Sequence, residues 1–319
     1  MEERSVDLRD RVTVWVPSTI ANLNVGFDAL GLALESPQER MELKRFQRVA
    51  GAPRVVIKLE PNSSLPSDPL RNVAGVAARS VLERGEADFG VEIEVFKPVR
   101  PGSGLGSSAA SAVAAAVGVS ALLPTPLPRE QLLECALDGE ELASGSRHLD
   151  NVAPAMFGGL CLSLSGERSI PLPVPTWWIV ILRPLVTVRT ADARAALPDH
   201  VSLSRASESA AWMGRFVDAC HRGDHRAAAR SLRDLYVGPA RAHLIPGFEL
   251  CRDAALSAGA INGGISGSGP STFWICLDQE SALSVEARLK EVMRGCGCEY
   301  RTFVTQPSLQ GAHSDLSKT

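Results

Sequence analysis

Hydrophobic and polar residues alternate over several short stretches of the chain, and this is the pattern of strands with one buried face. Elsewhere apolar residues recur every three or four positions, as they do on the buried side of a helix. The strand patterns predict strands at residues 12–16, 53–59, 91–96, 158–164, 178–182, 272–277 and 299–304. The helical patterns predict helices at residues 72–82, 109–121, 129–143 and 280–294, with two more on either side of Gly223.

The order of these elements predicts the fold class. Strands and helices are mixed irregularly, which favours an α+β fold over a doubly wound parallel sheet. The extended, proline-rich run Ile170–Pro175 is the best candidate for a domain boundary. We therefore expect an N-terminal domain over residues 1–167, a C-terminal domain over residues 168–305, and a polar, disordered tail over residues 306–319.

Composition and charge argue against several classes of function. A hydrophobic fraction of 45% and a charged fraction of 22% are typical of a globular protein, and a net charge of −3 provides no basic face for nucleic acid. No apolar run approaches the roughly 18 residues of a membrane span, and the polar start Met1–Arg4 is not a signal peptide. The seven cysteines contain no CxxC pair, so we expect a reduced, cytoplasmic chain without a structural metal.

The run Pro101–Ala110 is the most informative segment of the sequence. Glycines at 102, 104 and 106 let backbone N–H groups crowd around a ligand, and the following helix adds unpaired N–H donors and a partial positive charge. Such a helix start binds phosphate. The spacing is neither a Walker A loop nor the dinucleotide fingerprint, and a flexible Gly/Ser connector is the alternative interpretation.

The predicted helix at residues 129–143 carries a carboxylate on its apolar side. At about 100° per residue, Glu140 shares a stripe with Leu133, Ala136 and Leu137. A buried carboxylate is costly unless it is paired or binds a metal. Glu140 could therefore form a structural ion pair or bind magnesium. The run Pro101–Ala110, called the phosphate loop below, favours magnesium, with Ser108 as a second oxygen ligand.

Two other segments carry groups that suit a small charged substrate. Asn22 and Asp28 follow the first strand and offer an amide and a carboxylate. Thr190 and Arg194 lie one helical turn apart, so they can reach the same ligand, and Arg194 can hold a carboxylate through two bonds. Loops with Asx turns and a solvated surface arginine are the alternatives.

Three blocks together resemble a known family. Pro101–Ala110, His148–Pro154 and Gly263–Ser271 are similar, in order and residue type, to the three motifs of the GHMP kinases, and the resemblance spans residues 12–275. It implies the GHMP fold, with a ribosomal-S5-like N-terminal domain and a ferredoxin-like C-terminal domain. It also implies ATP and Mg²⁺ as cofactors.

The resemblance implies roles for individual residues. Ser108 and Glu140 would bind the magnesium, and Asn151 stands where mevalonate-type relatives carry an aspartate taken as the base. Because Asn cannot accept a proton in that role, we expect phosphoryl transfer to depend on positioning and charge neutralisation. The implied nucleotide-binding residues are Asn72, Pro101, Gly102, Ser103, Gly104, Leu105, Gly106, Ser107, Ser108 and Gly267. The implied substrate-binding residues are Asn22, Asp28, His148, Asn151, Thr190, Arg194 and Arg241.

Within the family, residues 17–32, 148–154 and 188–198 look most like those of the homoserine kinases. They imply transfer of a phosphoryl group to the side-chain hydroxyl of L-homoserine, a step toward threonine. Asp28, Arg194 and Arg241 together favour such a zwitterionic substrate. Another GHMP kinase acting on mevalonate or a sugar, and an inactive member that only binds nucleotide, remain as alternatives. The sequence does not define the oligomeric state, and the resemblance leaves a homodimer open because the family is commonly dimeric.

Overall fold

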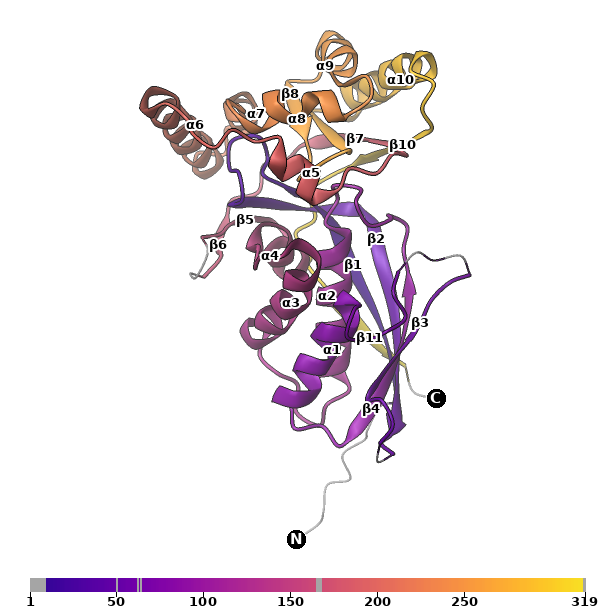
Figure 1. Ribbon diagram of the computed structural model, residues 1–319. Coiled ribbons are helices and arrows are strands. Elements are labelled where there is room, and N and C mark those ends of the chain that lie inside the picture. The colour runs from indigo at the N-terminus through magenta and orange to yellow at the C-terminus, as the bar shows by residue number, and fades with distance from the viewer. Residues whose placement is uncertain (1–9, 50, 62, 64, 165–167, 318–319) are drawn as a thin grey trace.

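The computed structural model describes residues 10–317, apart from residues 50, 62, 64 and 165–167. The described chain forms two layered domains stacked end to end (Figure 1). In the lower domain the strands run in the order β11-β1-β2-β4-β3, and β5 and β6 extend the sheet from the other end of β2. These strands are β1 (Arg11–Ala21), β2 (Leu30–Gln47), β3 (Val55–Lys58), β4 (Phe89–Phe96), β5 (Leu160–Leu162), β6 (Ile170–Leu172) and β11 (His313–Ser317).

Helices cover one face of this sheet (Figure 1). They are α1 (Val73–Arg84), α2 (Ser107–Ala121), α3 (Arg129–Ser144) and α4 (Leu149–Phe157). The central helix α2 packs against the sheet and the other three helices, and all but two of its 15 residues are buried. Its small side chains make this possible, since a Cβ added at Gly118 would lie 2.3 Å from Leu43. A helix enclosed on every side has a fixed position, and so does its N-terminus.

The upper domain is built on a four-stranded antiparallel sheet in the order β10-β7-β9-β8. Numbered within the domain, this is the 4-1-3-2 order of a ferredoxin-like sheet, as expected. Its strands are β7 (Trp178–Pro184), β8 (Asn262–Ile265), β9 (Thr272–Cys276) and β10 (Tyr300–Thr305). Its helices are α5 (Thr190–Ala195), α6 (Leu203–His221), α7 (His225–Ser231), α8 (Val237–Arg241), α9 (Phe248–Ser257) and α10 (Gln279–Gly295), with a short 3₁₀ turn, η1 (Ala242–Leu244).

The two domains share one apolar core. A single cluster of buried residues joins Ile20, Leu30 and Leu32 of the lower sheet to Ile181 and Phe273 of the upper sheet. A large apolar interface of this kind holds two domains in one arrangement. Residues contributed by both domains can therefore form a site of fixed geometry beside this interface.

The chain crosses between the domains where the sequence does not predict it. Disorder was expected from residue 306, and for the described residues this is wrong, because β11 pairs with β1 along residues 11–15 and Pro307 bridges to Leu34. The expected boundary before residue 168 is also wrong, since β6 pairs with β5 of the lower sheet.

Among the described residues, no helix is long and apolar enough to cross a bilayer.

Candidate active site

The phosphate loop adopts the left-handed backbone that its glycines allow. Gly102, Gly104 and Gly106 have φ values of 71°, 80° and 64°. A Cβ at Gly106 would lie 2.0 Å from Oγ1 of Thr19, so no larger residue fits there. In the described chain no side chain caps the start of α2 at Ser107. The first N–H groups of α2 thus point out of the helix toward the loop, where they can bind an anion.

The third glycine-rich block packs beside this loop, as its family motif implies. The hydroxyl of Ser266 donates to the carbonyl of Gly104 at 2.6 Å, and the N–H of Ser271 donates to the carbonyl of Ser103 at 3.1 Å. A Cβ at Gly104 would lie 2.5 Å from the Ser266 carbonyl oxygen. A segment of the upper domain therefore holds the loop through hydrogen bonds to its backbone carbonyls.

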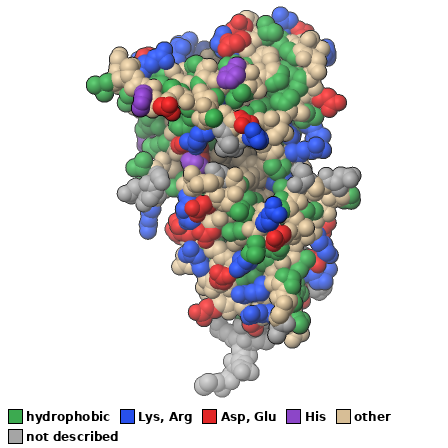
Figure 2. Space-filling view, viewed as in Figure 1, with side chains coloured by type: hydrophobic (Ala, Val, Ile, Leu, Met, Phe, Trp, Pro, Cys, Tyr) green, Lys and Arg blue, Asp and Glu red, His purple; other side chains and the backbone are tan. Residues whose placement is uncertain are grey.

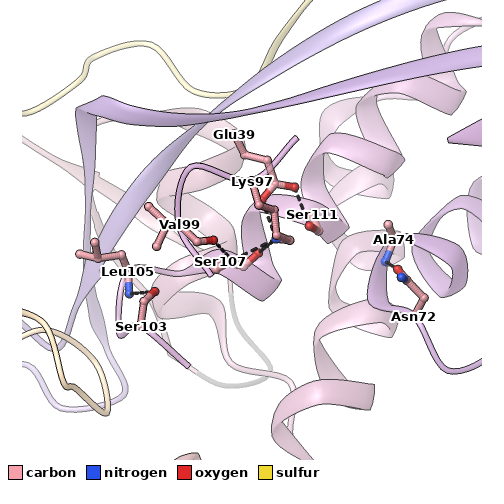
Figure 3. A network of polar contacts seen from close by, with 9 residues as sticks. All are labelled: Glu39, Asn72, Ala74, Lys97, Val99, Ser103, Leu105, Ser107 and Ser111. Atoms are coloured by element: carbon pink, nitrogen blue, oxygen red, sulfur yellow. Dashed lines mark hydrogen bonds and ion pairs between the residues drawn. The ribbon is translucent and has the colours of Figure 1, made fainter. Parts of the chain in front are cut away.

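A buried polar network supports the first turn of α2 (Figure 3). Nζ of Lys97 lies 2.7 Å from Oε2 of Glu39 and donates to the carbonyl and hydroxyl of Ser107 at 2.8 and 3.0 Å. Ser111 donates to Oε1 of Glu39 at 2.5 Å. Sequence reasoning did not identify this network, because a lysine just after a strand has the same local pattern as a surface lysine.

Ser108 and Glu140 meet at the entrance to the loop. The Ser108 hydroxyl, on α2, donates to Oε1 of Glu140, on α3, at 3.1 Å. Glu140 is 7% exposed, so the helical periodicity placed it correctly on the inner side. Burial, opposed by the Ser108 bond and assisted by Asp150, raises the pKa of the Glu140 carboxyl to about 7. A hydroxyl and a carboxylate oxygen beside a phosphate site form the hard donor set that Mg²⁺ prefers.

The block at residues 148–154 lies at the start of helix α4. His148 is the N-cap, and Asp150 and Asn151 lie in the first turn, facing the phosphate loop. The hydroxyl of Thr19 donates to Oδ1 of Asn151 at 2.6 Å. Burial, followed by the charge of Asp28, raises the pKa of the Asp150 carboxyl to about 7. Asp150 is a lining residue that the sequence-based assignment left out.

The loop after β1 holds Asp28 in an unusual backbone conformation. Asn22 and Asp28 have φ values of 71° and 55°, and the N–H of Asp28 donates to Oδ1 of Asn22 at 3.0 Å. The amide of Asn22 also donates to the carbonyl of Gly267 at 3.1 Å. Non-glycine residues in this region are strained and persist only where their surroundings fix them. The carboxylate of Asp28 is therefore presented from a rigid loop.

Two arginines of the upper domain approach this loop. Arg194, on α5, forms an ion pair with Asp28 and lies 3.3 Å from Nε2 of His148. Arg241 is 3% exposed, and its Nε and Nη1 donate to the carbonyls of Ala193 and Gly267 at 2.7 and 3.1 Å. Arg241 thus supports α5 and the third block as well as bordering the site.

These groups surround one cavity of about 250 Å³ between the domains. Figure 2 shows the surface hollowed at this junction, with charged side chains at the rim. The cavity brings together most of the residues that the sequence predicts. They are Asn22, Asp28, Pro101, Gly102, Ser103, Gly104, Gly106, Ser107, Ser108, Glu140, His148, Asn151, Arg194, Arg241 and Gly267. The cavity is also lined by Ala143, Asp150 and Ser268, which the sequence-based assignment did not include.

Among the predicted site residues whose side chains are described, Asn72 and Leu105 do not line this cavity. Asn72 caps α1, where its Oδ1 accepts from the N–H of Ala74 at 3.0 Å and its Nδ2 donates to the carbonyl of Pro66 at 2.8 Å. The side chain of Leu105 is buried in the core shared by the two domains. The side chain of Thr190 lies outside the part of the chain that the structure describes.

Comparisons with known proteins identify the family of this chain. The model of the GHMP kinases N terminal domain matches residues 72–159, and that of the GHMP kinases C terminal matches residues 216–295. A homoserine kinase of Xanthomonas campestris is 37% identical over 91% of this chain and 90% of its own length. The chain belongs to the GHMP kinase family. A homoserine kinase of Haloarcula marismortui is 36% identical over 92% of this chain and 97% of its own length.

Solved structures of GHMP kinases have the same fold. The crystal structure of homoserine kinase from Cytophaga hutchinsonii matches 99% of this chain and 100% of its own, with a TM-score of 0.91 and 36% identity. The crystal structure of L. major mevalonate kinase in complex with R-mevalonate matches with a TM-score of 0.70 and 16% identity, which shows a shared fold alone. The expected α+β GHMP fold is confirmed.

Proposed function

We propose that the protein transfers the γ-phosphoryl group of ATP to the side-chain hydroxyl of L-homoserine. The observation that carries this proposal is the pairing, in one cavity, of a phosphate loop with a carboxylate and two guanidinium groups. An α-amino acid with a terminal hydroxyl has an ammonium group and a carboxylate at one end and a nucleophile at the other. The similarity to homoserine kinases along the whole chain supports the same substrate.

The phosphate loop and α2 are assigned to the nucleotide. Backbone N–H groups from Gly102 to Ser108 would surround the phosphates. Ser108 and Glu140 would bind Mg²⁺, which would neutralise negative charge on the phosphates. With the metal bound, Glu140 would be ionised, because a neighbouring cation favours the carboxylate over the acid.

The opposite side of the cavity is assigned to the amino acid. Asp28 would bind the ammonium group, and Arg194 with Arg241 would bind the carboxylate, which leaves the hydroxyl directed toward the phosphate loop and Asn151. The hydroxyl oxygen forms a bond to the γ-phosphorus while the bond to the ADP oxygen breaks, and the proton passes to the transferred phosphoryl group. Asn151 donates a hydrogen bond and accepts no proton, so positioning supplies the catalysis.

A coupled ADP-release assay tests this proposal with L-homoserine, mevalonate, galactose, L-threonine and shikimate at equal concentrations. We expect kcat/KM for homoserine to exceed that for each other alcohol by about 100-fold or more, since unpaired charges in the site penalise the wrong ligands. Turnover of mevalonate without turnover of homoserine would contradict the substrate assignment. Tight ATP binding without any turnover would favour the inactive, nucleotide-binding alternative.

We also infer that the reaction takes place in the cytoplasm, where ATP and free amino acids are available. The seven cysteines are thiols in the structure, which suits a reducing compartment.

A further inference from the structure

Asp28 and Arg194 form a direct ion pair across the cavity. Nη1 of Arg194 lies 3.0 Å from Oδ2 of Asp28, and Nη2 lies 3.3 Å from Oδ1, so the contact has the two-bond geometry of a guanidinium and a carboxylate. These are the two groups that the proposed function assigns to the carboxylate and the ammonium of the substrate. A ligand therefore has to separate them before it can bind to both.

The two sides of this ion pair differ in how firmly they are held. Asp28 lies on the strained loop fixed by Asn22, and Asn24 anchors the same loop to the upper domain by donating to the carbonyls of Leu232 and Gly263 at 3.2 and 2.9 Å. Asp28 thus has little freedom to move.

Arg194 belongs to the six-residue helix α5, which has little apolar anchoring. Among the residues of α5 with described side chains, Ala193 alone is buried. The helix is held by Arg241 on one side, through the carbonyl of Ala193, and by the Asp28–Arg194 pair on the other. Breaking the pair therefore releases α5 rather than the loop of Asp28.

We propose that the Asp28–Arg194 ion pair acts as a placeholder for an α-amino acid zwitterion and requires a ligand to carry both charges. This inference rests on the proposed function. An ammonium group bound at Asp28 and a carboxylate bound at Arg194 replace the broken pair with two new ones. A ligand with one charge breaks the same pair and leaves one partner without a counter-ion, which costs affinity.

The contact also limits the spacing of the two charges on the ligand. Because the carboxylate and the guanidinium are in direct contact, a ligand inserted between them must present its own charges close together. An α-amino acid carries both charged groups on one carbon atom. Amino acids with the ammonium group moved further along the chain separate the charges and fit this exchange less well.

The first test measures α5 in the ligand-free, full-length protein by hydrogen–deuterium exchange of peptides covering residues 188–197. We expect Asp28→Asn and Arg194→Gln each to raise the exchange rate of this segment by about 3-fold or more, the equivalent of one exposed ion pair. Asp218→Asn is the matched control, since it removes an exposed pair with Arg222 on α6. Addition of L-homoserine should leave the wild-type segment protected, because the ligand replaces the pair.

The second test compares ligands by isothermal titration calorimetry. 4-Hydroxybutyrate is homoserine without the ammonium group, and 3-aminopropan-1-ol is homoserine without the carboxylate. We expect 4-hydroxybutyrate to bind about 3-fold or more tightly to Asp28→Asn than to the wild type, and 3-aminopropan-1-ol to gain similarly in Arg194→Gln. Homoserine should lose about 10-fold or more in both variants. Each substitution thus improves binding of the ligand that lacks the charged group bound by the substituted residue.

Unchanged exchange of residues 188–197 in both variants would overturn the proposal, because no pair would then hold α5 in solution. Equal or weaker binding of both one-charge ligands to the matching variants would also overturn it. If Asp28→Asn does not fold, Arg194→Gln, on an exposed helix, gives the same exchange readout. Failure of the wild type to phosphorylate homoserine would refute the proposed function, whereas the exchange result in the ligand-free protein does not depend on that activity.

Discussion

The hydroxyl of Thr19 donates a 2.6 Å hydrogen bond to Oδ1 of Asn151, and this bond connects the end of β1 to the first turn of α4. It uses the acceptor of the Asn151 amide and leaves the NH₂ group, which can only donate, for the cavity. Gly106 lies next to this bond, and a Cβ added there would collide with both hydrogen-bonded side chains. The orientation of Asn151 is therefore set by a residue on another strand.

Replacing Thr19 by the isosteric valine should free the Asn151 amide to rotate. We expect Thr19→Val to lower kcat for homoserine by about 10-fold, the value of one positioned donor, with a smaller change in KM. Thr19→Ser retains the hydroxyl and should stay within about 3-fold of the wild type. Steady-state kinetics with homoserine as the varied substrate checks both, and equal losses in the two variants would contradict this role.

Replacing Glu140 tests the magnesium assignment. We expect Glu140→Gln to lower kcat by about 100-fold or more, because an amide binds Mg²⁺ more weakly than a carboxylate and charge neutralisation is central to phosphoryl transfer. The concentration of Mg²⁺ needed for half-maximal rate should also rise. Glu134→Gln is the control, since Glu134 lies on the outer side of α3 and pairs with Arg147. A wild-type rate in Glu140→Gln would place the metal elsewhere.

The buried carboxyl of Asp150 predicts a specific dependence of stability on pH. Its pKa is raised from 3.8 to about 7 by burial and then by Asp28, so the folded chain holds this proton more tightly than the unfolded chain. Stability contributed at this site therefore falls as pH rises from about 4 to 7. In Asp150→Asn the carboxyl group is absent, so this fall in stability with rising pH does not occur.

The stability difference between Asp150→Asn and the wild type should increase with pH across this range, by at most about 1.4 kcal/mol per pH unit. Urea unfolding at pH 5, 6 and 7 measures it. The exposed Asp218→Asn variant should show no such trend. A difference that stays constant with pH would mean that Asp150 is ionised in the folded protein throughout the range.

Gly31 allows α4 to lie directly against β2. A Cβ at this position would be 1.7 Å from the carbonyl oxygen of Asp150. We expect Gly31→Ala to lower the free energy of unfolding by about 3 kcal/mol, because packed backbone has to move. Gly214→Ala, on α6, is the matched control, where no atom lies within 4 Å and alanine should stabilise the helix by about 1 kcal/mol. Chemical denaturation distinguishes the two results.

The Lys97–Glu39 pair is buried, so removing one partner should cost more than removing both. We expect Lys97→Met to lower the free energy of unfolding by about 3–5 kcal/mol, since Glu39 would keep an uncompensated charge. The double variant Lys97→Met/Glu39→Leu should recover most of that loss, because apolar residues can replace a buried pair. Thermal unfolding of the wild type, Lys97→Met and the double variant provides the measurement. A double variant at least as destabilised as Lys97→Met would contradict the coupling of the two charges.

Features that depend only on residues close together along the chain could be predicted from the sequence. The phosphate loop followed from glycines that permit a left-handed backbone and from a helix of small residues directly after them. The inward position of Glu140 followed from helical periodicity alone. The prediction of disorder for residues 306–317 was wrong because it also used local sequence alone. A short polar edge strand has no local pattern that distinguishes it from a polar tail.

The sequence by itself determined a glycine-rich loop ahead of a buried helix and an inward carboxylate on α3. It also marked two segments whose charges suit a small charged ligand. Only the tertiary structure decided which polar groups meet. Thr19 and Asn151 are 132 residues apart, Lys97 and Glu39 are 58 apart, and Asp28 and Arg194 are 166 apart. Local patterns fix the direction in which a side chain points, but the partner of a buried or charged group depends on how distant strands and helices pack, because hydrogen bonds and ion pairs form only between atoms in contact.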